Sequence, residues 1–185
     1  MLSKLSQRFY ESTLPYTVDL IDVSTIEKYP LNNKVNDEGK IIFFVNDDGD
    51  IIMTIENIRI KFLDFQRALQ RLDEALKKDI ASDDLYLDGI IQRFEFCFEL
   101  AWKTIQAFLA YDGLPGNSPR SCIREGAKVG LIADAEGWLD MLEKRNLSTT
   151  YNEETARLIY HGLTEKYHAL LRQLCKSCEN VLKSL

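Results

Sequence analysis

The stretch "GIIQRFEFCFELAWKTIQ" (89–106) decides the fold. Its large apolar residues recur at steps of three and four, at Ile90, Ile91, Phe94, Phe98, Trp102 and Ile105. This spacing places them on one face of a helix. Such a wide aromatic face must be buried, and we predict that it packs against other helices in a mainly α protein.

The segments on both sides of this stretch have the same helical periodicity. We predict helices from about Met53 to Leu76, from about Ser82 to Gly113, from Ser118 to Gly130, over 134–144, and from Asn152 to the C-terminus. Ser82, Ser118 and Asn152 have side chains suited to capping a helix start. Short loops between successive helices predict an up-and-down bundle.

Residues 1–52 differ from the rest of the chain. They contain two β-rich runs, "YTVDLIDV" (16–23) and "KIIFFV" (40–45), and the second leads through an Asp-Gly turn into "IIM" (51–53). This order predicts a short strand followed by a hairpin. We therefore expect two domains, a small α/β region over 1–52 and a helical domain over 53–185.

Composition limits the classes of function. The chain has 185 residues, of which 45% are hydrophobic and 28% charged, so it can bury a core. Its net charge of −6 argues against a general nucleic-acid coat, which needs a basic face. The acidity lies mostly in residues 1–52, so a local phosphate site in the helical part is still allowed. No signal peptide or membrane-spanning run is visible, and we expect a cytoplasmic protein with no membrane partner.

Four cysteines fall inside the predicted helices: Cys97, Cys122, Cys175 and Cys178. The last two form a CxxC pair, but a structural zinc site needs a second close pair of ligands. Residues three apart on a helix also share one face. We therefore favour buried, reduced cysteines over metal or redox chemistry.

Three phrases carry a family resemblance: "GIIQRFEFCFELAWKTIQ" (89–106), "SPRSCIREGAKVGLI" (118–132) and "WLDMLEKRNLSTTYNEE" (138–154). Together they resemble the nucleotidyltransferase substrate-binding protein family of the HEPN superfamily, over roughly residues 54–183. The resemblance implies a HEPN-type helical bundle that forms a homodimer. It also implies a separate minimal nucleotidyltransferase as partner, often in a toxin–antitoxin pair. ATP and Mg²⁺ would then come with the partner, and we assign no cofactor to this chain.

The first region resembles the C-terminal end of that partner. "LPYTVDLIDVSTI" (14–26) is similar to the last core strand of minimal nucleotidyltransferases, where an aspartate supplies one metal-binding carboxylate. By this resemblance the residue is Asp19. Two-metal phosphoryl transfer needs several carboxylates, so Asp19 alone is expected to be inactive. We interpret residues 1–52 as a transferase remnant joined to the helical partner.

The stretch "RNLSTTY" (145–151) resembles the motif of HEPN ribonucleases, but it lacks the motif histidine and its intervening segment is one residue shorter. Those enzymes have Arg and Asn, a few variable residues, His, one further residue and Tyr. Arg145, Asn146 and Tyr151 match this pattern and are weak catalytic candidates, but no histidine lies between them. The histidine supplies a general acid or base near neutral pH, while the arginine binds the scissile phosphate. We therefore expect phosphate binding without competent cleavage. Tyr151 is also a candidate acceptor of adenylate groups.

Two further constellations accompany this motif. Arg120, Arg124 and Lys128 recur every four residues and share one helix face, so they could bind nucleotide or RNA phosphate together with Arg145. A solvated charged face is the plainer interpretation. Glu95 and Glu99 could hold a metal, but we favour an interhelical ion-pair network, with Arg93 or a second subunit adding cations.

Three functional hypotheses follow. The leading one is a substrate-binding subunit that acts with a minimal nucleotidyltransferase. The second is a metal-independent endoribonuclease toxin built around Arg145. The third is a degenerate fusion product that folds but has no activity.

Overall fold

The computed structural model describes residues 44–45, 51–52, 54–81, 83–148 and 152–185. The chain divides into two compact units, Met1–Ile51 and Ile52–Leu185. Around their boundary, strand β1 (Phe44–Val45) pairs with strand β2 (Ile51–Ile52), as the predicted hairpin requires. The predicted transferase-like strand with Asp19 lies outside the described residues. The origin of residues 1–52 in a transferase therefore stays a prediction.

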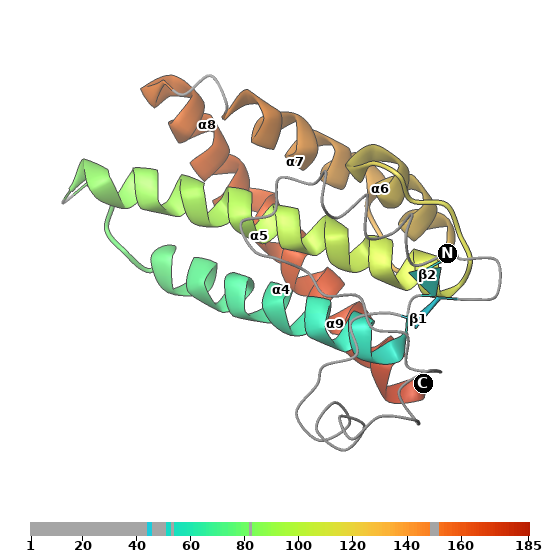
Figure 1. The fold of residues 1–185 in the computed structure, drawn as a ribbon. Coiled ribbons are helices and arrows are strands. Elements are labelled where there is room, and N and C mark those ends of the chain that lie inside the picture. Colours follow the sequence, from blue (N-terminus) through green and yellow to red (C-terminus); the bar gives the residue numbers. More distant parts are fainter. Residues whose placement is uncertain (1–43, 46–50, 53, 82, 149–151) are drawn as a thin grey trace, which may run out of the picture. The chain divides into compact units, whose positions relative to one another are not determined.

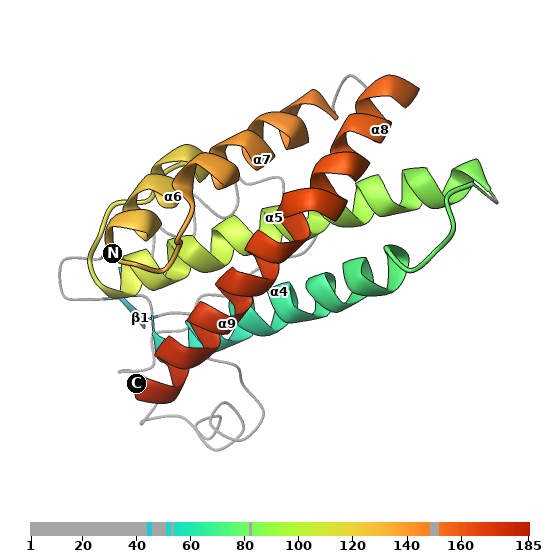
Figure 2. The same cartoon turned by 180° about the vertical axis from the view of Figure 1, so that it is seen from behind.

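The second unit is a helical bundle, which confirms the predicted fold class. Helices α4 (Ile55–Ala75) and α5 (Asp84–Tyr111) run side by side along most of their length (Figure 1). Helices α6 (Pro119–Lys128) and α7 (Ala135–Leu147) pack against α5. The final helical run crosses α5 and then α4, and it also contacts α7 (Figure 2). In the described residues, no helix is both long and apolar enough to cross a membrane.

The helix ends follow local capping chemistry. Thr54 and Asn57 form a capping box at the start of α4, and Ser118 and Ser121 form one at the start of α6. Gly113 and Gly130 have φ of 70° and 78°, the left-handed conformation that ends a helix. The predicted cap at Ser82 is wrong. Asp83 caps α5 instead, with its carboxylate accepting from the backbone N–H of Leu85 at 2.9 Å.

Helix α7 is longer than predicted. It ends at Leu147 rather than near 144, so Arg145 and Asn146 belong to its last turn and not to the following loop. Its N-terminus is capped by Asp134, whose pKa is lowered mainly by the hydrogen bond from the backbone N–H of Gly137. Because Arg145 lies within α7, the helix fixes its backbone.

The final run contains a π-helical turn that periodicity did not predict. Helix α8 (Glu153–Gly162) continues through η1 (Leu163–Tyr167) into α9 (His168–Ser184). Inside η1, the hydroxyl of Tyr167 donates to Asp140 of α7 at 2.6 Å, and its ring stacks on Phe94. A side chain on Gly162 would collide with that ring. The wider turn therefore fits a large aromatic residue into the core.

The core joins all the helices of the bundle. Phe94 and Phe98 of α5 are fully buried, and the ring of Phe98 lies 6.1 Å from that of Trp138 on α7. Trp102 is only half-buried, at the edge of the predicted stripe. This core fixes α5 against α7 and so sets the geometry of the charged residues that follow Phe94 and Phe98 in sequence.

Candidate functional site at the α5–α7 interface

Arg145 of α7 contacts the carboxylate of Glu99 on α5. One terminal guanidinium nitrogen lies 3.6 Å from Glu99 Oε2, and the other lies 3.5 Å from Asn146 Oδ1. These distances are longer than the 2.7–2.9 Å of a close charge-assisted hydrogen bond. The Arg145 side chain is 35% exposed. The guanidinium is therefore oriented by its neighbours while part of it faces solvent.

Glu99 has neighbours that favour its ionised form. Burial alone would raise the pKa of this carboxyl. The pKa is nevertheless lowered, because Trp102 Nε1 donates to Oε2 at 2.9 Å, Lys103 Nζ lies 3.1 Å from Oε1, and the charges of Lys103 and Arg145 are close. Glu99 is thus a carboxylate at neutral pH, and it opposes the charge of Arg145.

A second link between the two helices comes from Ser148, the residue that caps the end of α7. Its buried hydroxyl makes a short hydrogen bond to Glu95 Oε1 and also lies 2.5 Å from the carbonyl oxygen of Arg145. The bond to Glu95 ties the last turn of α7 to α5. Sequence reasoning missed Ser148, because a serine in a predicted loop carries no signal for such a contact.

We define the α5–α7 cluster as Glu95, Glu99, Arg145, Asn146 and Ser148. It confirms the predicted interhelical ion pairing for Glu99, whereas Glu95 is linked to α7 by the hydroxyl of Ser148 and not by an ion pair. The cation that pairs with Glu99 across the two helices is Arg145, not Arg93, and Lys103 pairs with Glu99 within α5. Arg93 instead donates to the backbone carbonyl of Arg71 on α4 at 2.7 Å. The difference follows from helix geometry, since residues 93 and 95 lie about 200° apart around α5 and face different neighbours.

Neither histidine belongs to the α5–α7 cluster. His168 Nε2 lies 2.5 Å from Asp73 Oδ1, and an Arg172 nitrogen lies 2.5 Å from Asp73 Oδ2, so these three residues join α4 to α9. His161 is exposed at the end of α8. Sequence reasoning also missed this second group, since Asp73 and His168 are 95 residues apart.

The three predicted phosphate-binding residues of α6 have different surroundings. Arg120 lies 3.6 Å from Glu143 of α7, and Lys128 lies 2.7 Å from Glu125 one turn earlier. The side chain of Arg124 is exposed and has no hydrogen bond or ion pair to the part of the chain that the structure describes. Of the three, Arg124 is thus the cation that no described carboxylate compensates.

Tyr151, Thr149 and Thr150 lie outside the described residues, so the closing half of the motif has no described geometry.

The structure describes all four cysteines. Cys97, Cys122 and Cys178 are buried, Cys175 is half-buried, and burial raises the pKa of all four thiols. Within 54–81, 83–148 and 152–185, no group of three or more His, Cys, Asp and Glu side chains is arranged to hold a metal ion.

Comparisons with known proteins show the family to which the chain belongs. The chain is 31% identical over 83 residues to a protein of Haemophilus influenzae named probable ribonuclease HepT; the match covers 42% of the chain and 57% of that relative. It is 38% identical to a Thermus thermophilus protein of known crystal structure, with a TM-score of 0.56, over 62% of this chain and 98% of that one.

A second solved structure, from Haemophilus influenzae, is described as having the fold of a substrate-binding domain of a nucleotidyltransferase. It is 21% identical, covers 68% of this chain and 99% of its own, and has a TM-score of 0.47. The family model described as nucleotidyltransferase substrate binding protein like matches residues 60–180, well over half of the chain and the whole α5–α7 cluster. The chain therefore belongs to the nucleotidyltransferase substrate-binding protein family.

Proposed function

We propose that this chain is a substrate-binding subunit that acts with a separate minimal nucleotidyltransferase and binds a nucleotide or RNA phosphate at Arg145. The observation that carries the proposal is how the Arg145 guanidinium is held and how far it is exposed. It is fixed on a helix and held loosely by Glu99 at 3.6 Å, with 35% of its side chain exposed. A guanidinium has five donors, so a phosphate can be bound while one edge still faces Glu99.

The neighbouring helix α6 supplies further cations for an extended ligand. It packs on α7, and Arg120 reaches Glu143 on that helix. Arg124 is exposed and uncompensated by any described carboxylate, and Lys128 follows one turn later with Glu125 as its partner. An RNA backbone that extends from Arg145 onto α6 would bind Arg124 without displacing a described carboxylate.

The partners in this proposal come from family membership. The subunit forms a homodimer in the cytoplasm, and a minimal nucleotidyltransferase brings ATP and Mg²⁺ to it in a toxin–antitoxin type pair. Tyr151 is the proposed adenylate acceptor. Asp19 has no role here, because one carboxylate cannot hold the two metal ions of phosphoryl transfer.

A second candidate function is RNA cleavage, which the name of the Haemophilus influenzae relative favours. The α5–α7 cluster offers no imidazole, and among the described residues His168 binds Asp73 while His161 is exposed on α8. Lack of one general acid or base typically costs about 10² to 10⁴ in rate. We therefore place binding above cleavage.

Two experiments test the proposal. In fluorescence anisotropy with a short single-stranded RNA, Arg145→Ala should weaken binding by about tenfold or more, because a charge-assisted contact is lost. Arg67→Ala is the matched control, since Arg67 forms an exposed pair with Asp64 elsewhere on the bundle. Equal affinity of both variants would contradict a phosphate site at Arg145.

Co-expression with a minimal nucleotidyltransferase tests the partner. A complex that co-elutes through size exclusion supports the proposal, whereas failure of both complex formation and RNA binding would favour the degenerate-fusion hypothesis. Incubation of the pure chain with RNA separates the enzymatic candidate. Cleavage that Arg145→Ala abolishes would make the chain a ribonuclease.

A further inference from the structure

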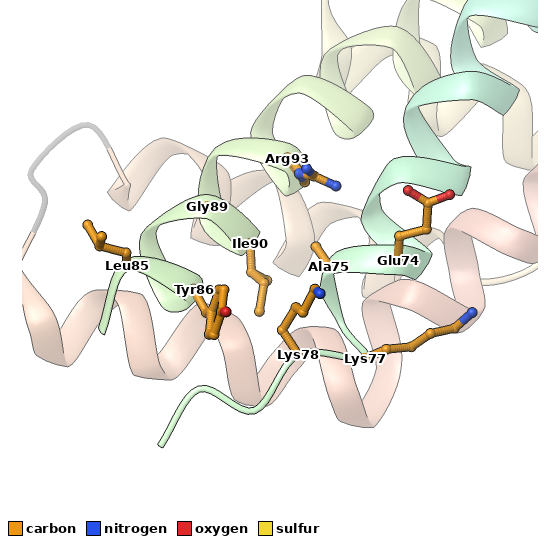
Figure 3. Close-up of a pocket in the computed structure, with 9 residues that line it drawn as sticks. All are labelled: Glu74, Ala75, Lys77, Lys78, Leu85, Tyr86, Gly89, Ile90 and Arg93. Atoms are coloured by element: carbon orange, nitrogen blue, oxygen red, sulfur yellow. The ribbon is translucent and has the colours of Figure 1, made fainter. Parts of the chain in front are cut away.

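A pocket of about 500 Å³ opens at the turn between α4 and α5, away from the α5–α7 cluster (Figure 3). Its charged lining residues are Lys77, Lys78 and Arg93, with Glu74 as the single carboxylate. This volume is within the range of pockets that bind small organic ligands. The cations of the lining outnumber its carboxylate, although the whole chain has a net charge of −6.

The two lysine side chains lack the partners that many basic residues of this bundle have. Lys103, Arg145, Lys166 and Arg172 all lie within 4 Å of a carboxylate oxygen. The ammonium groups of Lys77 and Lys78 have no hydrogen bond or ion pair to any described residue. Their charges are therefore available to a bound anion at no cost in broken ion pairs.

Arg93 is held in place by the protein itself. One of its terminal nitrogens donates to the carbonyl oxygen of Arg71 at 2.7 Å, which fixes the guanidinium at the wall of the pocket and leaves other N–H donors unused by that bond. A pre-oriented guanidinium loses less side-chain entropy when it binds an anion.

The rest of the lining suits a flat ring. Lys78 and Tyr86 lie on either side of Ile90, and the guanidinium of Arg93 lies further along α5 (Figure 3). Tyr86 is 38% exposed, and Ile90 forms an apolar, buried floor. Gly89 adds no side chain, and a Cβ built there meets no atom within 4 Å. An aromatic wall beside an open glycine gives space for a base or a similar ring.

We propose that this pocket is a second ligand site, which binds a nucleotide with its phosphates at Lys78 and Arg93 and its base against Tyr86. Lys77 is a further cation of the lining, and its side chain extends away from Tyr86 (Figure 3). The site is distinct from Arg145, because Arg93 faces α4 while Glu95 and Glu99 face α7.

Calorimetric titration of the full chain with ATP, tripolyphosphate and adenosine, without added metal, tests this assignment. ATP should bind at least about tenfold more tightly than either fragment, since only ATP reaches both the cations and Tyr86. Lys78→Gln should weaken ATP binding by about tenfold, because a charge-assisted contact to phosphate is lost. Tripolyphosphate binding as tightly as ATP would overturn the nucleotide assignment.

Three further variants test whether ATP binds in this pocket and not elsewhere on the chain. Lys176→Gln, the same change on the exposed face of α9, should leave ATP affinity unchanged. Gly89→Leu should block the pocket in a chain that still folds, as a thermal melt would check, because leucine favours a helix and its Cβ enters open space. ATP binding that survives Lys78→Gln and Gly89→Leu, or no binding of ATP at millimolar concentration, would overturn the proposal.

Arg145→Ala, the third variant, separates this site from the proposed function. The proposed function lets Arg145 bind a nucleotide phosphate as well, so Arg145→Ala can remove one ATP-binding event. The separate event that Lys78→Gln weakens should remain in this variant with unchanged affinity. If Arg145→Ala abolishes ATP binding while Lys78→Gln does not, the second site is wrong and the Arg145 site stands. If Lys78→Gln alone weakens ATP binding, the second site stands whatever the RNA result.

Discussion

Two charged clusters join helices that are far apart in sequence, and they differ in how closely the partners of each carboxylate approach it. In the α4–α9 cluster, Asp73 uses both carboxylate oxygens at 2.5 Å, one for His168 and one for Arg172. In the α5–α7 cluster, Arg145 lies 3.6 Å from Glu99. The first arrangement leaves Asp73 fully engaged and 20% exposed. The second leaves a guanidinium that can still meet a ligand.

The difference supports the proposed preference for phosphate binding over RNA cleavage. An imidazole and an arginine are both present, but the imidazole of His168 closes α4 against α9 while Arg145 lies between α5 and α7. Phosphate binding needs only the second cluster. Proton transfer at the phosphate would need the imidazole there too.

The largest expected effect comes from breaking the α4–α9 cluster. Asp73→Ala removes the carboxylate from both His168 and Arg172, and we expect it to lower the free energy of unfolding by about 2 kcal/mol, since hydrogen bonds to charged groups contribute about 1.5–3 kcal/mol. RNA binding should not change. Urea denaturation followed by circular dichroism measures the first quantity, and anisotropy the second.

Asp64→Ala is the control on the same helix. Asp64 pairs with Arg67, one turn away, and both side chains are about half exposed or more. Exposed pairs of this kind contribute less than about 1 kcal/mol. If Asp73→Ala weakened RNA binding as strongly as Arg145→Ala, the division between a structural and a ligand-binding cluster would be wrong.

Periodicity and capping residues predicted most of this fold. The spacing of Phe94 and Phe98 indicated the buried face of α5, and Ser118 with Gly130 indicated both ends of α6. Periodicity could not predict the π-turn at Leu163–Tyr167. That turn depends on how the ring of Tyr167 fits above Gly162 and beside Phe94, which is a matter of tertiary packing.

The candidate site was only half predictable for a related reason. Arg145 and Asn146 were visible as a motif, and the pair Glu95 and Glu99 was visible as a like-charge conflict that a cation must relieve. Which cation relieves it depends on the crossing of α5 and α7, not on local spacing. Ser148 and Asp73 gave no signal because their partners are 53 and 95 residues away.

A smaller effect is expected from Ser148→Ala, which tests whether the hydrogen bond between the end of α7 and α5 stabilises the fold. The change removes the donor to Glu95 in a buried position, and we expect a loss of about 1 kcal/mol in the free energy of unfolding. Ser184→Ala is the matched control, because Ser184 is exposed in the last turn of α9 and its hydroxyl donates to the nearby carbonyl of Val181. Identical denaturation midpoints for the two variants would contradict the link between α7 and α5.

The smallest effect tests the looseness of the Arg145 pair directly. Glu99→Gln keeps an acceptor for Trp102 but removes the charge that opposes the guanidinium. We expect RNA affinity to rise about threefold, or about 0.6 kcal/mol, as for the loss of a competing exposed pair. Glu153→Gln, which breaks the exposed pair with Arg157 on α8, should leave affinity unchanged.

Acid titration gives the same variant a second readout. The pKa of Glu99 is lowered in the folded chain. Its ionised form therefore stabilises the fold at pH values above the ordinary carboxyl pKa. This stabilisation is lost as the pH falls through the lowered pKa of the folded chain. The stability difference between the unaltered chain and Glu99→Gln should therefore shrink on acidification. The affinity difference should shrink with it, because protonated Glu99 no longer opposes Arg145. A stability difference that vanishes while the affinity difference persists would mean that Glu99 affects RNA binding by some route other than its charge.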